Sequence, residues 1–526
     1  MNRRSFFTRS VLAAGGIAGF PHLGRPQSIR QLAPGQKPAR IIHMVADGMS
    51  MGTLTAADYF SQQVRRRGLT WLALYQRPEA RHGLMNMRSL NSMVTDSSAA
   101  SSSWGSGSRV VNGAVNLLPS GRSLTPLYAL FGELGWKRGL VTTTEITHAT
   151  PAGFAASVDN RDSGQLIAAQ YLKHEIDVLL GGGQKFFTPR RRADKRDLKA
   201  EFATHGYALM ENATRLAEAA TDQRWLGIFA ESHLPYALDQ MGDARLMAAV
   251  PTLPKMTGRA LQWLGRHEHF ILQIEGGRVD HAAHNNDAPA AMHEMLMFDE
   301  ALDLVLEFQK QRPDTLVIIT TDHGNGNLGV NGAGTDYGQS TPAFKRIAAV
   351  RASFAEIMRR LRCEAPTALS VTEDDFPVSA VTDANSTKAA TPPPHIPTVK
   401  EIQALMLETT GYKVSNRRAG WFLAFLENKG TSVYEAMNSE MVQLGQLLGN
   451  HISVGWTGSA HTADYVPVTA MGPGADLFSG FLQNTDVFRH YTDLAGIDFR
   501  NPTEPMTAAV TVRPGTQENV AEYALA

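Results

Sequence analysis

Carboxylate and histidine side chains cluster around the ends of short apolar runs of the sequence, the kind of run that forms buried parallel strands. In an open α/β sheet, ligands bind beyond the carboxyl ends of the strands, so residues at these positions are candidates for chemistry. The residues are Asp47, Glu275, Asp280, His284, Asp322, His323 and His461. Four carboxylates in one crevice repel each other unless cations neutralise them. The pattern therefore predicts a site for more than one metal ion.

The sequence contains one cysteine, Cys363. An intramolecular disulfide and a thiolate-rich zinc or iron–sulfur cluster are therefore excluded. Imidazole combined with carboxylate suits zinc, whereas ligation by oxygen alone suits magnesium. We expect a mixed site that holds its metal ions with histidine, aspartate and glutamate.

A serine-rich segment at residues 95–105 is the candidate for a nucleophile. Its composition fits a flexible linker equally well. Asp96, however, is a good helix N-cap, and the Ala/Ser run after it can continue as a helix. Ser97 would then lie at the positive end of the helix dipole, where both an ionised serine and a bound phosphate are favoured.

The elements that must position these residues alternate between strands and helices. Apolar runs predict strands at residues 41–46, 139–142, 178–180, 270–274, 316–320 and 466–470. Amphipathic segments lie between them; one has apolar residues at helical spacing over residues 295–305, after Pro289. This alternation predicts a three-layer α/β/α sandwich around a mostly parallel sheet.

The 526 residues provide enough material for two to four domains. Residues 324–338 are rich in Gly and Asn, and helical patterns follow at 354–361 and 437–448. We expect residues 324–455 to form a partly helical insertion with its own small core, because a plain loop of this length would be unusual. Residues 37–323 and 456–526 would then form the catalytic domain.

Charge and the N-terminus constrain the partners and the location of the protein. Lys and Arg total 50, as do Asp and Glu, so the chain has no net positive charge to attract nucleic acid or anionic lipid. The segment NRRSFF at residues 2–7, followed by a weakly apolar stretch at 11–20, is typical of a Tat export signal. We expect residues 1–36 to be signal and linker, the mature protein to be periplasmic or secreted, and no stable membrane span to remain after processing.

Six motifs follow one another in a familiar order. They are Asp47-Gly48-Met49, Thr95-Asp96-Ser97 through Asn112-Gly113-Ala114, His148-Ala149-Thr150-Pro151, Glu275 to His284, Thr321-Asp322-His323, and His461-Thr462. They resemble the successive metal and nucleophile motifs of alkaline phosphatases, a family of zinc and magnesium phosphomonoesterases. The resemblance covers most of residues 40–323 and 456–475, and the insertion carries none of the motifs.

The resemblance implies two zinc ions and one further ion, usually magnesium. It assigns Asp280, His284 and His461 to the first zinc, Asp322, His323 and Asp47 to the second, and Asp47, Thr150 and Glu275 to the third ion. Ser97 matches the nucleophile, which would attack a phosphate monoester and form a phosphoserine intermediate, and Arg161 matches the arginine that clamps the phosphate. His148 and His281 occupy positions near the third ion and the phosphate where family members vary.

Other readings remain open. A phosphodiesterase, sulfatase or phosphonate hydrolase of the same superfamily would use similar zinc ligands with a different nucleophile. A catalytically silent metal- or phosphate-binding protein would need the ligands but no activated Ser97. The third-ion set together with Arg161 favours the dianionic monoester, so we expect small phosphomonoester substrates and no specific nucleic-acid partner.

The insertion resembles in position the crown of the family, which implies a lid or a contact within a homodimer. Several histidines have no motif support, and we expect them not to bind metal. They are His43, His174, His233, His267, His269, His293 and His451.

Overall fold

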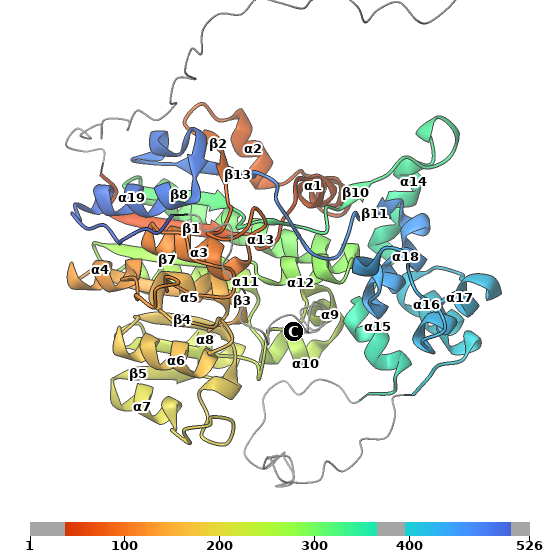
Figure 1. Cartoon of the computed structure of the whole chain (residues 1–526), viewed down its shortest axis with the longest axis horizontal. Helices are drawn as coiled ribbons and strands as arrows, with labels where there is room; N and C mark the ends of the chain where they lie inside the picture. The colour runs from red at the N-terminus through yellow and green to blue at the C-terminus, as the bar shows by residue number, and fades with distance from the viewer. Residues whose placement is uncertain (1–36, 365–394, 506–526) are drawn as a thin grey trace, which may run out of the picture.

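The computed structural model describes residues 37–364 and 395–505. Its centre is a ten-stranded sheet in the order β14-β2-β13-β8-β1-β7-β3-β4-β6-β5 (Figure 1). The strands are β1 Arg40–Val45, β2 Arg81–Asn86, β3 Lys137–Glu145, β4 Val178–Gly182, β5 Tyr207–Met210, β6 Arg224–Ile228, β7 Phe270–Glu275, β8 Thr315–Thr320, β13 Val466–Met471 and β14 Gly480–Gln483. The expected export signal at residues 1–36 lies outside the described residues.

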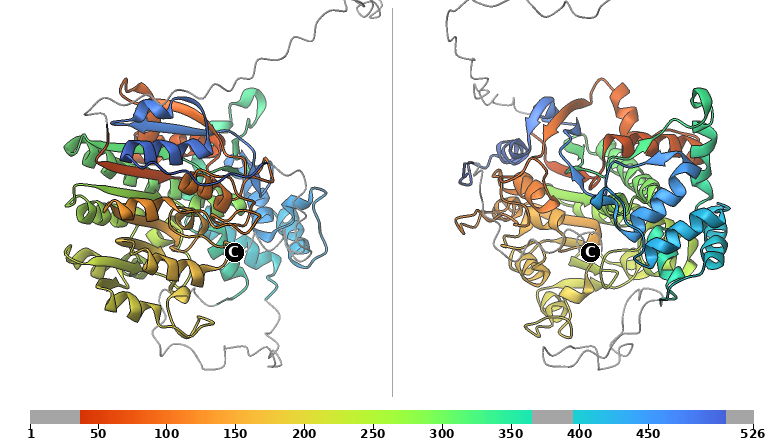
Figure 2. Two further views of the ribbon diagram at one scale, coloured as in Figure 1. Left: turned by 60° about the vertical axis from the view of Figure 1, so that its left-hand side comes forward. Right: turned by 45° about the vertical axis from the view of Figure 1, so that its right-hand side comes forward.

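Helices cover both faces of the sheet, as Figure 2 shows, and the predicted three-layer α/β architecture is confirmed. The helices up to the end of β8 are α1 Met51–Arg65, α2 Thr70–Ala73, α3 Ser97–Ser106, α4 Leu127–Glu133, α5 Ala149–Ala155, α6 Gly164–Lys173, α7 Leu198–Thr204, α8 Ala213–Glu218, α9 Ala237–Gly242, α10 Ala244–Ala249, α11 Leu253–Leu264, α12 Arg278–His284 and α13 Ala288–Gln311. A last helix, α19 Asn484–Ala495, follows β14. None of the described helices combines the length and apolarity needed to cross a bilayer.

The central strands are apolar because both of their faces are buried. In β1, Ile42 and Met44 join one hydrophobic cluster, whereas Ile41 and Val45 join the cluster on the opposite face. This alternation follows from the period of two in a strand, and burial of both faces removes any need for polar residues. It explains why the continuous apolar runs predicted the central strands.

For the central sheet, the predictions were wrong for one strand direction and missed four strands. The run at 466–470 was expected among the parallel strands, but β13 runs antiparallel to both β8 and β2. The run itself carries no sign of its direction, because direction depends on the path of the preceding chain. The strands β2, β5, β6 and β14 were not predicted, since their composition is mixed and β5 and β14 have only four residues each.

Residues 324–455 leave the sheet after β8 and return before β13. Short strands pair at the two ends of this excursion: β10 Gly329–Val330 with β11 Val454–Gly455, and β9 Gly324–Asn325 with β12 His461–Thr462. The helices between them are α14 Ser340–Phe344, α15 Phe354–Leu361, α16 Val399–Thr410, α17 Asn416–Leu426 and α18 Glu440–Ile452. They gather at one side of the molecule next to α12 (Figure 1).

The insertion does not have the separate core that the sequence suggested. Buried Phe354 and Ile357 of α15 and Leu444 of α18 belong to the same hydrophobic cluster as Met292 of α13. Helices α15 and α18 therefore share one continuous hydrophobic core with the main domain. The proposed boundaries at 323/324 and 455/456 stay a prediction.

Candidate functional site

The serine-rich segment forms helix α3, and Ser97 is its first residue. Asp96 caps the helix, because its side chain accepts a hydrogen bond of 2.8 Å from the backbone N–H of Ala99. The helix is buried along its whole length and packs closely on α5: a Cβ added at Gly105 would lie 1.9 Å from the carbonyl oxygen of Gly153. This close approach requires small residues. The predicted capped helix is confirmed, and the alternative of a flexible linker is wrong.

Three neighbouring strands bring the predicted carboxylates together. β8, β1 and β7 are adjacent, and Val45 of β1 pairs with Glu275 of β7 and with Thr320 of β8. Because the parallel strands end level with one another, the residues that follow them converge at one edge. Asp47 and Asp322 are fully buried there, as is Glu275.

A first group of possible ligands consists of Asp280, His284 and His461. Asp280 and His284 are four residues apart on α12 and so share one face of the helix. The Nε2 atom of His284 lies 3.3 Å from Oδ2 of Asp280, and the Nε2 atoms of the two histidines are 3.0 Å apart. The sequence-predicted set is thus brought together.

The two histidines of this group point their Nε2 atoms at each other. Nδ1 of His284 donates to the carbonyl oxygen of Ser459 at 2.7 Å, and Nδ1 of His461 donates to that of Thr95 at 2.8 Å. In a neutral ring the proton on Nδ1 leaves a lone pair on Nε2. Two lone pairs 3.0 Å apart repel unless a proton or a cation lies between them. This geometry fits a shared metal ion, with the carbonyl groups fixing the rings.

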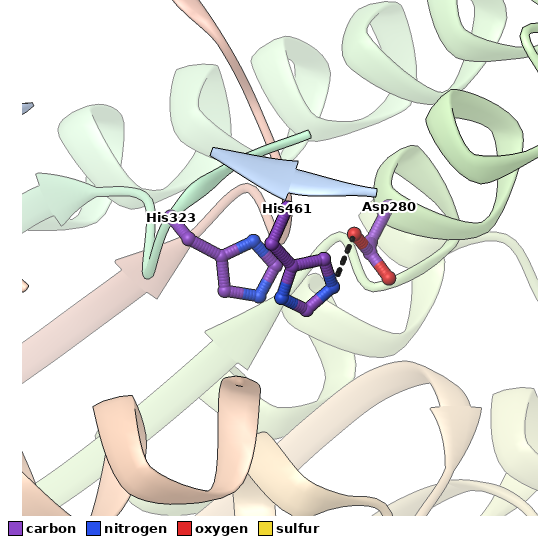
Figure 3. A group of neighbouring side chains, drawn as sticks. All are labelled: Asp280, His323 and His461. Carbon is purple, nitrogen blue, oxygen red and sulfur yellow. Dashed lines mark ion pairs between the residues drawn. The ribbon is translucent and has the colours of Figure 1, made fainter. Parts of the chain in front are cut away.

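A second group consists of Asp47, Asp322 and His323, whose ligand atoms lie within 4.8 Å of one another. Nε2 of His323 lies 3.2 Å from Oδ2 of Asp322 and 3.6 Å from Oδ1 of Asp47. His323 also stacks on His461, with 3.6 Å between the ring centroids. Figure 3 shows these two rings beside Asp280. The first and second groups are therefore directly adjacent.

A third group combines Asp47 and Glu275 with His148, again within 4.8 Å. Thr150, which the resemblance assigned to this set, donates from Oγ1 to Oδ2 of Asp47 at 3.5 Å. Glu275 accepts a hydrogen bond of 2.5 Å from Thr142 of β3. Both Thr150 and His148 are thus brought to this place, so the third group offers an imidazole nitrogen in addition to oxygen atoms.

Several buried oxygen atoms in these groups make no hydrogen bond to any described residue. They are Oδ1 of Asp47, Oε1 of Glu275 and Oδ2 of Asp322. Burial, followed by the charges of Asp322 and Asp280, raises the pKa of Asp47 well above its usual range, and burial raises the pKa of Glu275 to about 7. Unpartnered buried carboxyl oxygens are costly, and bound cations would satisfy them. The donor set therefore fits metal ions.

Ser97 faces this cluster. It is 1% exposed, and its Oγ lies 3.1 Å from Nε2 of His323. Arg161 lies on the same side: Nη1 donates to Oδ2 of Asp96 at 3.2 Å, and Nη2 donates to Nε2 of His148 at 3.2 Å. Asp96 thus bonds both to helix α3 and to the arginine. Ser97 and Arg161, the two residues predicted to act on phosphate, are connected through Asp96.

The structure adds one residue that motifs did not predict. The ring of His233 lies 4.4 Å from that of His281 and 5.5 Å from that of His148, between ring centroids. Burial, followed by neighbouring rings and cations, lowers the pKa of His233 and of His281 well below the usual range, and burial lowers that of His148 to about 3. All three rings are neutral at neutral pH. His233 lies in the loop after β6, a strand that the sequence analysis did not predict, so no local signal marked it.

The sheet, the buried carboxylate–histidine groups and the capped serine define an α/β enzyme that binds metal ions at the carboxyl ends of its strands. The family model for alkaline phosphatase matches residues 39–497. The chain belongs to the alkaline phosphatase family and is a phosphomonoester hydrolase that acts on small phosphomonoester substrates.

Individual relatives agree with this assignment. The chain is 31% identical over 408 residues to "Alkaline phosphatase 4" of Bacillus subtilis, a match that covers 75% of each chain. Among solved structures, Thermus thermophilus alkaline phosphatase superposes with a TM-score of 0.78 at 32% identity, covering 90% of this chain and 95% of that one. A cold-active alkaline phosphatase from Shewanella sp. gives 0.67 at 27% identity, with 86% and 99% covered.

Proposed function

We propose that the chain hydrolyses phosphate monoesters in two steps through a phosphoserine at Ser97. The observation that carries the proposal is the position of Ser97: its hydroxyl is buried at the start of α3, 3.1 Å from His323, within reach of the carboxylate–histidine groups. A helix N-terminus directs its free amide N–H groups at a bound anion. Ser97 is thus set where a phosphoryl group would be held.

In the first step, the Ser97 hydroxyl gives up its proton and Oγ forms a bond to phosphorus, while the bond from phosphorus to the alcohol oxygen breaks and that oxygen takes up a proton to leave as the free alcohol. Arg161 holds two nonbridging oxygens as a fork, oriented by its hydrogen bond to Asp96. In the second step, water attacks phosphorus, the bond to Oγ breaks, and inorganic phosphate and the free Ser97 hydroxyl result. The chemistry that bound cations supply here is neutralisation of the carboxylates and of the charge on the attacking and leaving oxygens.

We assign the first and second groups to zinc, because imidazole and carboxylate together suit that ion. Asp280, His284 and His461 would hold one zinc ion; Asp47, Asp322 and His323 would hold the other. Magnesium would bind between Asp47, Glu275 and Thr150, where oxygen donors predominate. His148 would determine which ion binds at this third site, since its imidazole lies close enough to Asp47 and Glu275 to act as a ligand.

The test is to trap the intermediate. Protein loaded with zinc and magnesium is mixed with p-nitrophenyl phosphate, quenched in acid within milliseconds and digested for mass spectrometry. We expect a phosphate on the peptide that contains Ser97, a burst of p-nitrophenol, and neither in Ser97→Ala. Ser103→Ala is the matched control, because Ser103 only bonds to the carbonyl of Ala99 within the same helix. An unphosphorylated peptide with normal turnover would contradict the proposal.

The same assay separates the rival activities. The proposal requires the monoester to be hydrolysed much faster than bis-p-nitrophenyl phosphate and p-nitrophenyl sulfate. Preference for the diester or the sulfate would indicate a different branch of the superfamily. Binding of phosphate without turnover would indicate a silent binding protein.

We infer export by the Tat route from residues 2–7 and a homodimer in which the 324–455 insertion forms part of the contact or a lid. Replacing Arg3 and Arg4 with lysine should retain the protein in the cytoplasm, which cell fractionation measures. Light scattering should give the mass of a dimer, and deletion of residues 340–450 should change assembly or substrate preference. An exported lysine variant or a monomer would contradict these inferences.

A further inference from the structure

His233 belongs to a compact group of three histidines beside Arg161. The ring centroids of His148, His233 and His281 lie 4.4 to 5.6 Å from one another. His148 caps helix α5, His281 lies on α12, and His233 lies in the loop after β6. His148 accepts a hydrogen bond from Arg161, so the group adjoins the arginine that is to hold the phosphate.

The protons on two of these rings are fixed by hydrogen-bond donors. The backbone N–H of Glu145 donates to Nδ1 of His233 at 3.1 Å. Nη1 of Arg278 donates to Nδ1 of His281 at 2.6 Å, and a guanidinium cannot accept. A neutral ring that accepts at Nδ1 carries its proton on Nε2. Within residues 37–364 and 395–505, no group accepts a hydrogen bond from Nε2 of either ring.

The loop that carries His233 is held on both sides. The backbone N–H of Gly183 donates to the carbonyl of Ser232 at 2.8 Å, and the N–H of Leu234 donates to that of Thr143 at 3.0 Å. A Cβ added at Gly182 would lie 2.0 Å from the Ser232 oxygen, so the loop packs on bare backbone. The Nε2–H of His233 is therefore preorganised, which lowers the cost of binding a ligand.

We propose that His233 is a phosphate-binding residue whose Nε2–H donates a hydrogen bond to a nonbridging oxygen of the phosphoryl group. It supplements Arg161, whose fork also bonds to Asp96 and His148. A neutral donor adds a hydrogen bond to the anion without adding a charge that would slow the release of phosphate. This inference rests on the proposed phosphomonoesterase site.

The test measures binding of inorganic phosphate to the zinc- and magnesium-loaded protein by calorimetry. His233→Phe keeps a ring but has no donor, and we expect it to raise the Kd about tenfold, as for one hydrogen bond to a charged group. His233→Gln can place its amide N–H near the position of Nε2 and should stay within about threefold of wild type. His233→Asn reaches only the position of Nδ1 and should resemble Phe, which keeps the test valid if Phe misfolds.

The control is His293→Phe, another partly buried histidine, which packs against Phe60. We expect its phosphate Kd to be unchanged. An unchanged Kd in both His233→Phe and His233→Asn would overturn the proposal. So would loss of metal ions in these variants, or a rise in KM that depends on the leaving group while inorganic phosphate binds normally. If wild type neither binds phosphate nor hydrolyses monoesters, the proposed function itself fails.

Discussion

The two halves of the site differ in how their buried polar atoms are paired. The acidic half, defined as Asp47, Glu275, Asp280 and Asp322, contains buried oxygen atoms without hydrogen-bond partners in the described structure. The histidine half, defined as His148, His233 and His281, consists of neutral rings, each with one nitrogen paired to an N–H donor. The acidic half is incomplete without cations. Each ring of the histidine half is held by a hydrogen bond from the protein.

This difference between the two halves suggests that each has a separate role in binding the same phosphate group. Buried carboxylates concentrate negative charge, which repels a dianion until cations reverse the sign. Neutral imidazoles leave the net charge unchanged and orient hydrogen-bond donors. We therefore expect variants of the acidic half to change metal content and rate together, and variants of His233 and His281 to change phosphate affinity with metal content intact.

The largest effect should come from Asp47→Asn, since Asp47 belongs to both the second and the third group. We expect kcat/KM to fall more than about 100-fold, beyond the loss typical of a residue that only supports a ligand. In metal-depleted protein the same change removes a buried carboxyl whose ionised form is destabilised by burial and by the neighbouring carboxylates, so the free energy of unfolding should rise by roughly 1 to 4 kcal/mol. Denaturant titrations of Asp47→Asn and wild type, with and without metal, measure this gain in stability in the metal-depleted protein.

Asp303→Asn is the control for this prediction, because Asp303 is a half-exposed residue of α13 that pairs with Arg67. The change in the free energy of unfolding caused by Asp303→Asn should be the same with and without metal. If Asp47→Asn destabilises the metal-depleted protein as much as the loaded one, repulsion within the acidic half is not the cause of its need for cations.

A smaller effect should follow from Arg278→Met, which removes the donor to Nδ1 of His281. The His281 ring could then carry its proton on either nitrogen, and we expect phosphate to bind about tenfold more weakly with metal content unchanged. Arg259→Met is the matched control, since that arginine lies over Trp225 at 5.2 Å. Loss of metal with normal phosphate affinity would mean that the two halves do not act separately.

The smallest effect concerns a buried acid that forms no ion pair within the part of the chain that the structure describes. Glu294 is 2% exposed and accepts a hydrogen bond from the N–H of Ala237; burial raises its pKa to about 7. A raised pKa adds stability that is fully present below the unfolded-state value and is lost as pH rises through 7. Between pH 6 and 8, wild type should lose about 1 kcal/mol that Glu294→Gln retains.

Chemical denaturation at the two pH values checks this difference. Glu307→Gln, on the exposed side of the same helix, should follow wild type. Parallel pH dependence of Glu294→Gln and wild type would show that burial alone does not keep this carboxyl protonated, and would weaken the argument made for the acidic half.

The acidic half could be predicted from sequence, as could His148 and His281 of the histidine half, whereas His233 could not. Asp47, Glu275 and Asp322 adjoin long apolar runs that form central strands, so their convergence follows from the parallel sheet. His233 follows β6, whose sequence RWLGI has no clear strand pattern. Its contacts with His148 and His281 depend on how a loop packs on the backbone of Gly182 and Gly183, which no local pattern records.

The same limit applies to the fold. The helix at Ser97 was predictable because a cap and a run of small residues are local features. The antiparallel direction of β13 was not, since it depends on how 324–455 returns to the sheet. Register and direction are set by long-range packing, whereas caps and apolar runs are visible in the chain itself.

The central claim is that the acidic half holds the cations on which phosphoryl transfer to Ser97 depends. Native mass spectrometry of chelated protein, titrated with zinc and magnesium while p-nitrophenyl phosphate turnover is followed in the same samples, tests it most directly. The account predicts three ions per chain at saturation, with turnover appearing only as the zinc sites fill. Full turnover by the metal-free chain, or saturation without any bound ion, would contradict it.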